Sequence, residues 1–235
     1  ENPVVASVFP TFSITMILFS TYVKPFSGGL TNFFWFGGLI LHIVLMLWFT
    51  QSFVLNKQYN IKKVFPSWFI PYVGIAVASV TAGAVGMQAL GQIIFWFALA
   101  SFIILLPIVL KRVYQVKAIP EAALATIGIL SAPASLCLAG YMNSFEVKNL
   151  SLVYGLLIIS QLLYLLVLSY IPKIISLPFY PSYSGFTFPL VISGLALKLS
   201  NGFLAKTGNP ISFLPNLVRL EELIGLWACL YVLIR

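Results

Sequence analysis

Side chains that commonly perform catalysis or bind metals are scarce in this chain of 235 residues. It has one histidine, His42, two cysteines, Cys137 and Cys229, and five acidic residues. The histidine and both cysteines fall inside long apolar segments, with no CxxC pair and no central pair of carboxylates. Metal binding and acid–base catalysis need several such groups close together. The sequence therefore predicts no enzyme, no metal site and no cofactor, and we interpret both cysteines as small packing residues.

The composition indicates an all-α integral membrane protein. Hydrophobic residues make up 60% of the chain and charged residues 8%, and the mean hydropathy is +1.03. So few charges cannot solvate the surface of a globular domain of this size. A helix needs about 20 apolar residues to cross a hydrocarbon core, whereas a barrel strand needs about 10. We expect one transmembrane pore domain over residues 1–235, with eight spans at 3–23, 30–54, 67–86, 88–110, 120–140, 150–171, 183–200 and 216–234.

Prolines alternate along these segments. Pro10, Pro71, Pro133 and Pro189 lie in the first, third, fifth and seventh segments, which are also rich in serine and threonine. A proline removes an intrahelical hydrogen bond, and in lipid the freed carbonyl needs a neighbouring helix, a hydroxyl or water. The even segments are more apolar, although Pro107 interrupts the fourth. We expect helical hairpins around a central pore, with kinked odd helices inside and even helices outside; close packing of small residues is the alternative explanation.

The odd segments carry no acidic or basic residue near their middle. Intramembrane charges usually mark proton relays, ion coupling or voltage sensing, and no arginine series at three-residue spacing is present either. An uncharged lumen in a chain of net charge +8 suits anions that move down their gradient. The basic residues lie mostly between apolar segments, so we expect the lipid bilayer, and not nucleic acid, as the surrounding partner.

The remaining ionisable residues near helices have simpler explanations. We expect Glu121, Glu221 and Glu222 to lie near helix starts, where the macrodipole favours an acid, and Arg219 can pair with Glu222. His42 lies mid-span and is either a hydrogen-bonded packing residue or a proton carrier.

Two lysines, Lys198 and Lys206, flank the end of the seventh segment. They either concentrate anions at the pore mouth or extend toward the membrane surface as ordinary interfacial lysines.

The distribution of basic residues predicts the orientation. Eight lie on one side of the predicted membrane and five on the other, so the positive-inside bias places both ends of this chain in the cytoplasm. We therefore expect a multi-pass protein of the plasma or inner membrane. The larger group is Lys57, Lys62, Lys63, Lys111, Arg112, Lys117, Lys173 and Arg235, and the smaller is Lys24, Lys148, Lys198, Lys206 and Arg219.

Three stretches resemble one known family. The segment PSWFIPYVGIA from Pro66 to Ala76 closely resembles the signature of the tellurite-resistance/dicarboxylate transporter family, whose members include TehA-like and plant slow-type anion channels. The stretches from Asn2 to Tyr22 and from Tyr183 to Pro189 are similar to the same family, so the resemblance covers essentially the whole chain. It implies ten helices in five hairpins around a pore, usually as a homotrimer with one pore per subunit. The implied partners are small anions such as chloride and nitrate, with malate and sulfite as further candidates.

The resemblance also implies a gate. Members of the family close the pore midway with a phenylalanine of the second-last helix, and Phe188 matches it best. Phe186 is the rival, because it lies about 200° round the helix and the two rings cannot both face the lumen. We favour Phe188 because it directly precedes Pro189. Phe12 and Phe69 are expected to support it, and the expected pore-lining residues are Pro10, Phe12, Ser13, Phe69, Pro71, Pro133, Thr187 and Pro189.

The chain differs from the family in having eight predicted spans. The motifs suggest that the first hairpin is missing at the amino end, so we expect a piece of a longer protein; the other possibility is a pore completed in another way. We expect a passive anion channel. The alternative is a proton-coupled transporter of a C4-dicarboxylate, of sulfite or of a tellurite-related substrate, with His42 as its coupling group. The transported anion and the opening signal are left open.

Overall fold

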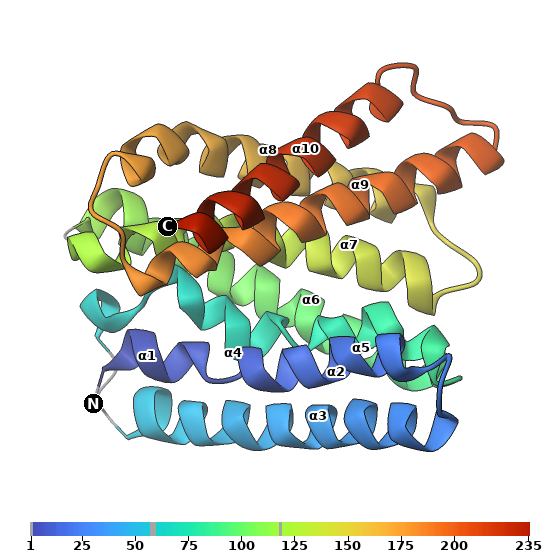
Figure 1. Ribbon diagram of the computed structural model, residues 1–235, viewed down its shortest axis with the longest axis horizontal. Coiled ribbons are helices and arrows are strands. Elements are labelled where there is room, and N and C mark those ends of the chain that lie inside the picture. The colour runs from blue at the N-terminus through green and yellow to red at the C-terminus, as the bar shows by residue number, and fades with distance from the viewer. Residues whose placement is uncertain (1, 57–59, 118) are drawn as a thin grey trace. The chain divides into compact units, whose positions relative to one another are not determined.

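The computed structural model describes residues 2–56, 60–117 and 119–235, and the regular structure of these residues is entirely helical (Figure 1). By length and composition, six helices could cross a membrane, and a seventh if the bent pair Pro66–Val73 and Ala76–Ala84 forms one span. The predicted all-α membrane class is confirmed, and the predicted count of eight spans is approximate. The six are Pro3–Val23, Gly28–Leu55, Gln88–Val116, Glu121–Ser144, Leu150–Ile175 and Pro181–Lys206.

The eighth predicted segment forms helix α10 (Leu214–Ile234), which is not among these membrane-crossing candidates. Its length of 21 residues would suffice for a span. What sets it apart is its charge, because Arg219, Glu221 and Glu222 all lie in its first half.

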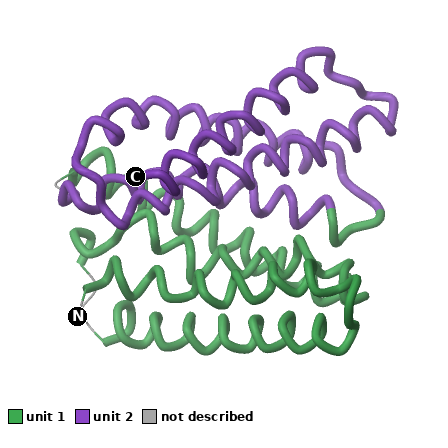
Figure 2. Tube along the Cα trace, in the orientation of Figure 1, with its two compact units in different colours: residues 1–118, 143–146 green, residues 119–142, 147–235 purple. Residues whose placement is uncertain are grey.

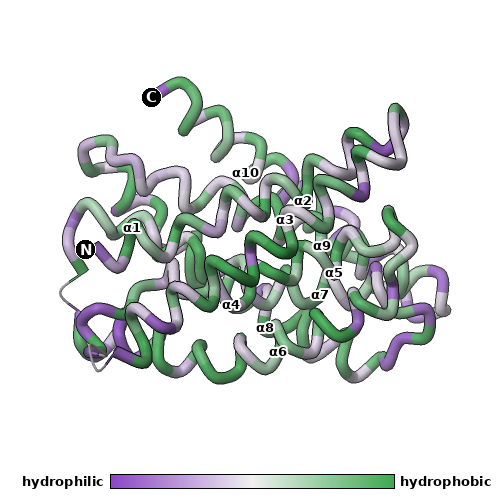
Figure 3. Tube along the Cα trace, turned by 90° about the horizontal axis from the view of Figure 1, so that it is seen from below, coloured by the Kyte–Doolittle hydropathy of each residue, from purple (hydrophilic) through white to green (hydrophobic). Residues whose placement is uncertain are grey.

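The chain folds as two compact units (Figure 2). Unit 1 comprises residues 1–118 and 143–146, and unit 2 comprises residues 119–142 and 147–235. Hydrophobic residues dominate the lengths of α6 (Gln88–Lys111) and α8 (Leu150–Ile175), while the hydrophilic residues concentrate toward helix ends and connections (Figure 3).

Unit 1 begins with two helices, α1 (Pro3–Val8) and α2 (Thr11–Val23), that together make the first candidate span. The Asn2 side chain caps α1 by accepting a hydrogen bond from the Val4 amide. The long helix α3 (Gly28–Phe49) follows, capped by the Ser27 hydroxyl. The other elements of unit 1 are η1 (Thr50–Leu55), η2 (Ile61–Lys63), η3 (Pro66–Trp68), α4 (Phe69–Val73), α5 (Ala76–Thr81), η4 (Ala82–Ala84), α6 and η5 (Arg112–Val116).

Unit 2 contains two tight 3-10 segments that each lead directly into an α-helix. The first, η6 (Glu121–Ser131), runs into α7 (Ala132–Ser144), whose last two residues belong to unit 1. The second, η7 (Pro181–Phe186), runs into α9 (Thr187–Lys206). Helices α8 and α10 complete the unit. A 3-10 run of 11 residues is unusually long for this geometry, and the sequence did not predict it.

We predicted that the four alternating prolines kink the interiors of helices. Instead, each of them lies at the start of a helix. Pro10 is the N-cap of α2, Pro71 is the third residue of α4, Pro133 the second of α7 and Pro189 the third of α9. The first turn of an α-helix has no intrahelical partner for its N–H groups, so a proline there removes no α-helical bond. The odd segments are therefore interrupted as expected, but by junctions between short helices. The bend at one such break, between α4 and α5, is 48°.

Candidate functional site

The histidine of unit 1 joins three of its helices. The Nδ1 atom of His42 lies 2.9 Å from the Ser13 hydroxyl of α2, and its Nε2 atom lies 3.0 Å from the Pro71 carbonyl oxygen of α4. The imidazole is fully buried. Since a carbonyl oxygen only accepts, Nε2–H donates to Pro71, and in a neutral ring Nδ1 competes with the Pro10 carbonyl oxygen for the single proton of the Ser13 hydroxyl. Both nitrogens have partners, which favours the packing interpretation of His42 over that of a proton carrier.

Ser13, which we expected to line the pore, and several other buried hydroxyl groups of unit 1 are engaged in hydrogen bonds within the protein. The Ser13 hydroxyl, fully buried, also lies 2.6 Å from the Pro10 carbonyl oxygen. Other buried links of the same kind are Ser7 to Ser67 at 2.6 Å, Trp35 Nε1 to Thr81 at 2.9 Å, and Ser79 to Ser144 at 3.0 Å. These bonds satisfy polar groups that lipid could not.

The two phenylalanines expected to support the gate have different surroundings. Phe12 on α2 is 65% exposed, whereas Phe69, at the start of α4, is 2% exposed. The Phe69 ring packs 6.2 Å from that of Phe102 on α6. Phe69 is thus part of the core of unit 1, and Phe12 lies on its surface.

The two gate candidates are also distinguished by burial. Phe186 is fully buried in unit 2, where its Cβ lies 2.4 Å from the position that a Cβ on Gly128 would take. Its ring is 5.7 Å from that of Tyr183. Phe188, the second residue of α9, is only half-buried. Of these two aromatic rings, only that of Phe188 has a free surface.

The other expected lining residues of unit 2 cluster around the same junction or at the start of α7. Thr187 is half-buried and donates to the Ser184 carbonyl oxygen at 2.8 Å, while Pro189 is buried. Pro133 is buried in the first turn of α7. The sequence could place these residues on particular helices, but no periodicity reveals that Gly128 makes room for Phe186.

The lysine expected at the end of the seventh segment lies well inside a helix. Lys198 is the twelfth of the 20 residues of α9, because the helix continues through Asn201 and Gly202 to Lys206. Its Nζ pairs with the Glu222 carboxylate of α10 at 2.8 Å, and both side chains are exposed. Glu222 thus pairs across two helices, where we had expected Arg219 as its partner.

The sequence analysis misjudged Glu221. We expected helix-end electrostatics, but Glu221 is the eighth residue of α10 and fully buried. Neither carboxyl oxygen forms a well-aligned hydrogen bond with any residue that the structure describes. Glu121, by contrast, lies at the exposed start of η6 as expected, and accepts a hydrogen bond of 2.7 Å from the Tyr180 hydroxyl, which raises the pKa of Tyr180.

Two further observations concern possible metal ligands and the cysteines. Among the residues that the structure describes, no three His, Cys, Asp or Glu side chains gather as metal ligands. Cys137 is buried and Cys229 half-buried, and both are free thiols.

Lys57, expected to help set the orientation, lies outside the described residues.

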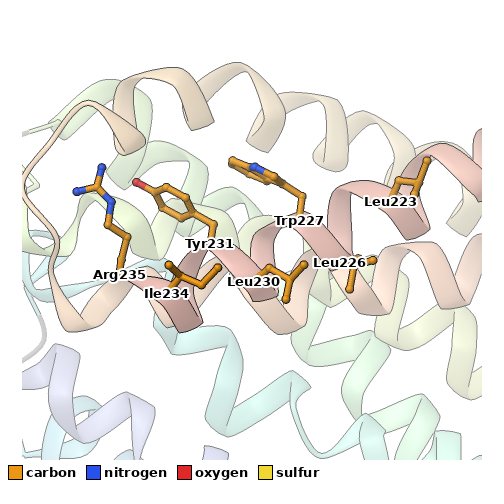
Figure 4. Close-up of a pocket in the computed structure, with 7 residues that line it drawn as sticks. All are labelled: Leu223, Leu226, Trp227, Leu230, Tyr231, Ile234 and Arg235. Carbon is orange, nitrogen blue, oxygen red and sulfur yellow. The ribbon is translucent and has the colours of Figure 1, made fainter.

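A shallow pocket lies along α10, and none of the predicted gate or lining residues contributes to it (Figure 4). Its centre is formed by Trp227 and Tyr231, whose rings stack 5.4 Å apart, and the Arg235 guanidinium lies 5.6 Å from the Tyr231 ring. Stacked aromatic rings next to a basic residue are typical of a membrane–water interface.

The comparisons with known proteins agree with this helical, apolar architecture. A family model described as voltage-dependent anion channel matches residues 1–213. No curated protein matches the chain.

Proposed function

The chain belongs to the voltage-dependent anion channel family, and we propose that it is a passive anion channel whose lumen is closed midway by Phe188. Membership of this family makes the protein an anion channel or transporter of a membrane, in a family that is not enzymatic. The passive mechanism, the gate and the particular anions are the proposal.

The observation that carries the proposal is the contrast between the two phenylalanines at the start of α9. Phe186 is locked into the core of unit 2 against Gly128, so its ring cannot swing without opening a cavity. Phe188 has a free surface and precedes Pro189, at the junction where η7 becomes α9. This position lets the Phe188 ring rotate while the helix behind it stays fixed.

An aromatic plug can gate an anion path with little structural change. A hydrophobic constriction loses its water, and an anion that passes must shed part of its hydration shell. Rotation of one phenylalanine side chain removes that barrier at far lower cost than the displacement of a helix. Since the sequence has no arginine series at three-residue spacing, we expect the current of an opened pore to be ohmic.

The surroundings of His42 support passive transport. A proton-coupled mechanism needs a group that can exchange its proton during the cycle, and His42 was the central candidate for it. Its ring is fully buried and both its nitrogens have partners in unit 1. We therefore propose that His42 holds helices together and takes no part in transport.

The remaining parts of the proposal follow the family resemblance. We propose chloride and nitrate as the conducted anions, with malate and sulfite as weaker candidates, and a homotrimer with one pore per subunit. We further propose a single pore domain in the plasma or inner membrane, with both ends of this chain cytoplasmic.

Current through the purified protein in a planar bilayer tests the passive mechanism. We expect a current whose reversal potential follows the chloride gradient. An imposed proton gradient should leave this reversal potential unchanged. Proton-driven uptake of a dicarboxylate or sulfite into vesicles, with no such current, would contradict the proposal and identify a coupled transporter.

A further inference from the structure

Three buried polar groups without hydrogen-bond partners lie on three helices of unit 2. They are the Glu221 carboxyl of α10, the Ser193 hydroxyl of α9 and the Tyr164 hydroxyl of α8. The exposed fraction of these residues is 0% for Glu221 and Ser193 and 2% for Tyr164. Buried polar groups in proteins are nearly always paired, so three unpaired ones in one unit require an explanation.

These groups converge on the carboxyl. Ser193 and Gln161 both interact with Glu221, and Tyr164 interacts with it through charge. Gln161 lies three residues before Tyr164, on the same side of α8. Although they lie close to the carboxyl, none of these side chains forms a well-aligned hydrogen bond with either of its oxygens. The result is a small polar site whose potential donors lie near an acid without such a bond to it.

Two glycines, Gly194 and Gly225, lie at the contact between α9 and α10 near Glu221. A Cβ on Gly194 of α9 would lie 3.5 Å from the Glu221 Cβ, and a Cβ on Gly225 of α10 would lie 3.3 Å from a Val191 side-chain carbon. The backbones of α9 and α10 therefore pack closely on both sides of the site.

Among the residues that the structure describes, no basic side chain forms an ion pair with this acid. Of the charged residues on α9 and α10, Lys198 pairs with Glu222 at an exposed position, and Arg219 is itself exposed. On α8, the ionisable group that faces Glu221 is Tyr164. An unpaired carboxylate in the interior is strongly disfavoured, and a small positively charged ligand would neutralise Glu221.

We propose that Glu221, Ser193 and Tyr164 form a proton-binding site of unit 2, and that proton exchange at this site controls anion flow. The bound proton converts the carboxylate into a neutral acid, and its loss returns a proton to water and leaves a negative charge. Ser193 and Tyr164 must then turn toward the carboxylate to donate to it. Ser193 lies five residues after Phe188 on the same helix, so α9 connects the site to the proposed gate.

Infrared spectroscopy of the purified protein tests the site without any transport assay. We expect the carbonyl band of a protonated carboxylic acid at neutral pH, shifted in D2O and lost in Glu221→Gln. Glu222→Gln is the matched control, because Glu222 is exposed and ion-paired, and it should keep the band. Absence of the band from the wild type, or its persistence in Glu221→Gln, would overturn the proposal.

Anion current measured from acidic to alkaline pH tests control of the flow, and this part rests on the proposed function. We expect the wild-type current to follow a one-proton titration. Glu221→Gln, a neutral mimic of the protonated acid, should lose that dependence and keep the current of the acidic limit, while Glu222→Gln retains the dependence. Equal pH dependence in wild type and Glu221→Gln would refute the control of anion flow by protons. A current that depends on the Na⁺ concentration and not on pH would refute it as well. An absent current together with an intact infrared band would refute the channel and leave the proton site standing.

Discussion

At the scale of single residues, hydrogen-bond capacity decides which polar groups are structural. His42 has two nitrogens and finds two partners, Ser13 and the Pro71 carbonyl, so its position is fully determined by packing. Glu221 has two oxygens and finds none. The sequence analysis offered packing or proton transfer for His42 and assigned Glu221 to helix-end electrostatics, because an acid beside another acid near a helix start is not conspicuous.

Replacement of His42 tests its structural role. In His42→Leu the Pro71 carbonyl oxygen loses its buried donor, and we expect a loss of about 1 to 3 kcal/mol in the free energy of unfolding. Thermal or denaturant unfolding in detergent measures it. Ile43→Leu, at the neighbouring and more exposed position, should change stability by no more than about 0.5 kcal/mol. Unchanged stability in His42→Leu would show that its hydrogen bonds are dispensable.

At the scale of the helices, the proline pattern correctly predicted which segments are interrupted, and it was wrong about the geometry. A proline in the first turn starts a helix as readily as an internal one kinks it, and composition does not separate the two cases. The length of α9 was also underestimated. Hydropathy falls after Ser200, but Asn201 and Gly202 continue the helix to Lys206, which places Lys198 inside it.

The contact between η6 and η7 gives a test of how closely the buried Phe186 is packed. In Gly128→Ala the new methyl group would lie 2.4 Å from the Phe186 Cβ and 2.9 Å from its Cα, so backbone must move. We expect destabilisation by about 1 to 3 kcal/mol, measured by unfolding in detergent. Gly155→Ala on α8 is the control, because nothing lies within 4 Å of its added carbon. Equal stability of the two variants would contradict the close packing of η6 on η7.

The ion pair between α9 and α10 gives a second test at this scale. Neutralising Lys198 alone leaves Glu222 unpaired and negative, and an uncompensated negative charge repels anions. We expect Lys198→Gln to lower the anion conductance more than the double variant Lys198→Gln, Glu222→Gln does. The pair itself should contribute only about 0 to 1 kcal/mol to stability, since both side chains are exposed. Equal conductance in single and double variants would show that neither charge lies near the anion path.

At the scale of the whole molecule, the membrane class and the family could be predicted from composition and from the PSWFIP stretch alone. Long apolar segments leave few alternatives to helices in lipid. The burial of Phe186 and Glu221 could not be predicted, because it depends on contacts between segments that are distant in the sequence. For Phe186 the reason is Gly128, because a Cβ there would lie 2.4 Å from the Phe186 Cβ, whereas a Cβ on Gly194 would make only ordinary contacts with Glu221.

The predicted orientation can be checked by labelling single cysteines from either side of the membrane. In a background with Cys137→Ala and Cys229→Ala, we expect Lys62→Cys and Arg235→Cys to react with an impermeant thiol reagent only from the cytoplasmic side. Lys148→Cys and Asn209→Cys should react only from the opposite side. Labelling of all four from one side would contradict the alternating spans, and the reverse assignment would contradict the positive-inside interpretation.

The most direct test of the central claim is the anion current of Phe188→Ala beside that of the wild type and of Phe186→Ala. If Phe188 closes the lumen, its removal should raise an ohmic chloride or nitrate current by about tenfold or more, as a barrier lower by about 1.4 kcal/mol would. Phe186→Ala should instead destabilise the protein by about 3 to 5 kcal/mol, as the loss of a core phenylalanine does, without opening the pore. An unchanged current in Phe188→Ala, or an open pore in Phe186→Ala alone, would contradict the account.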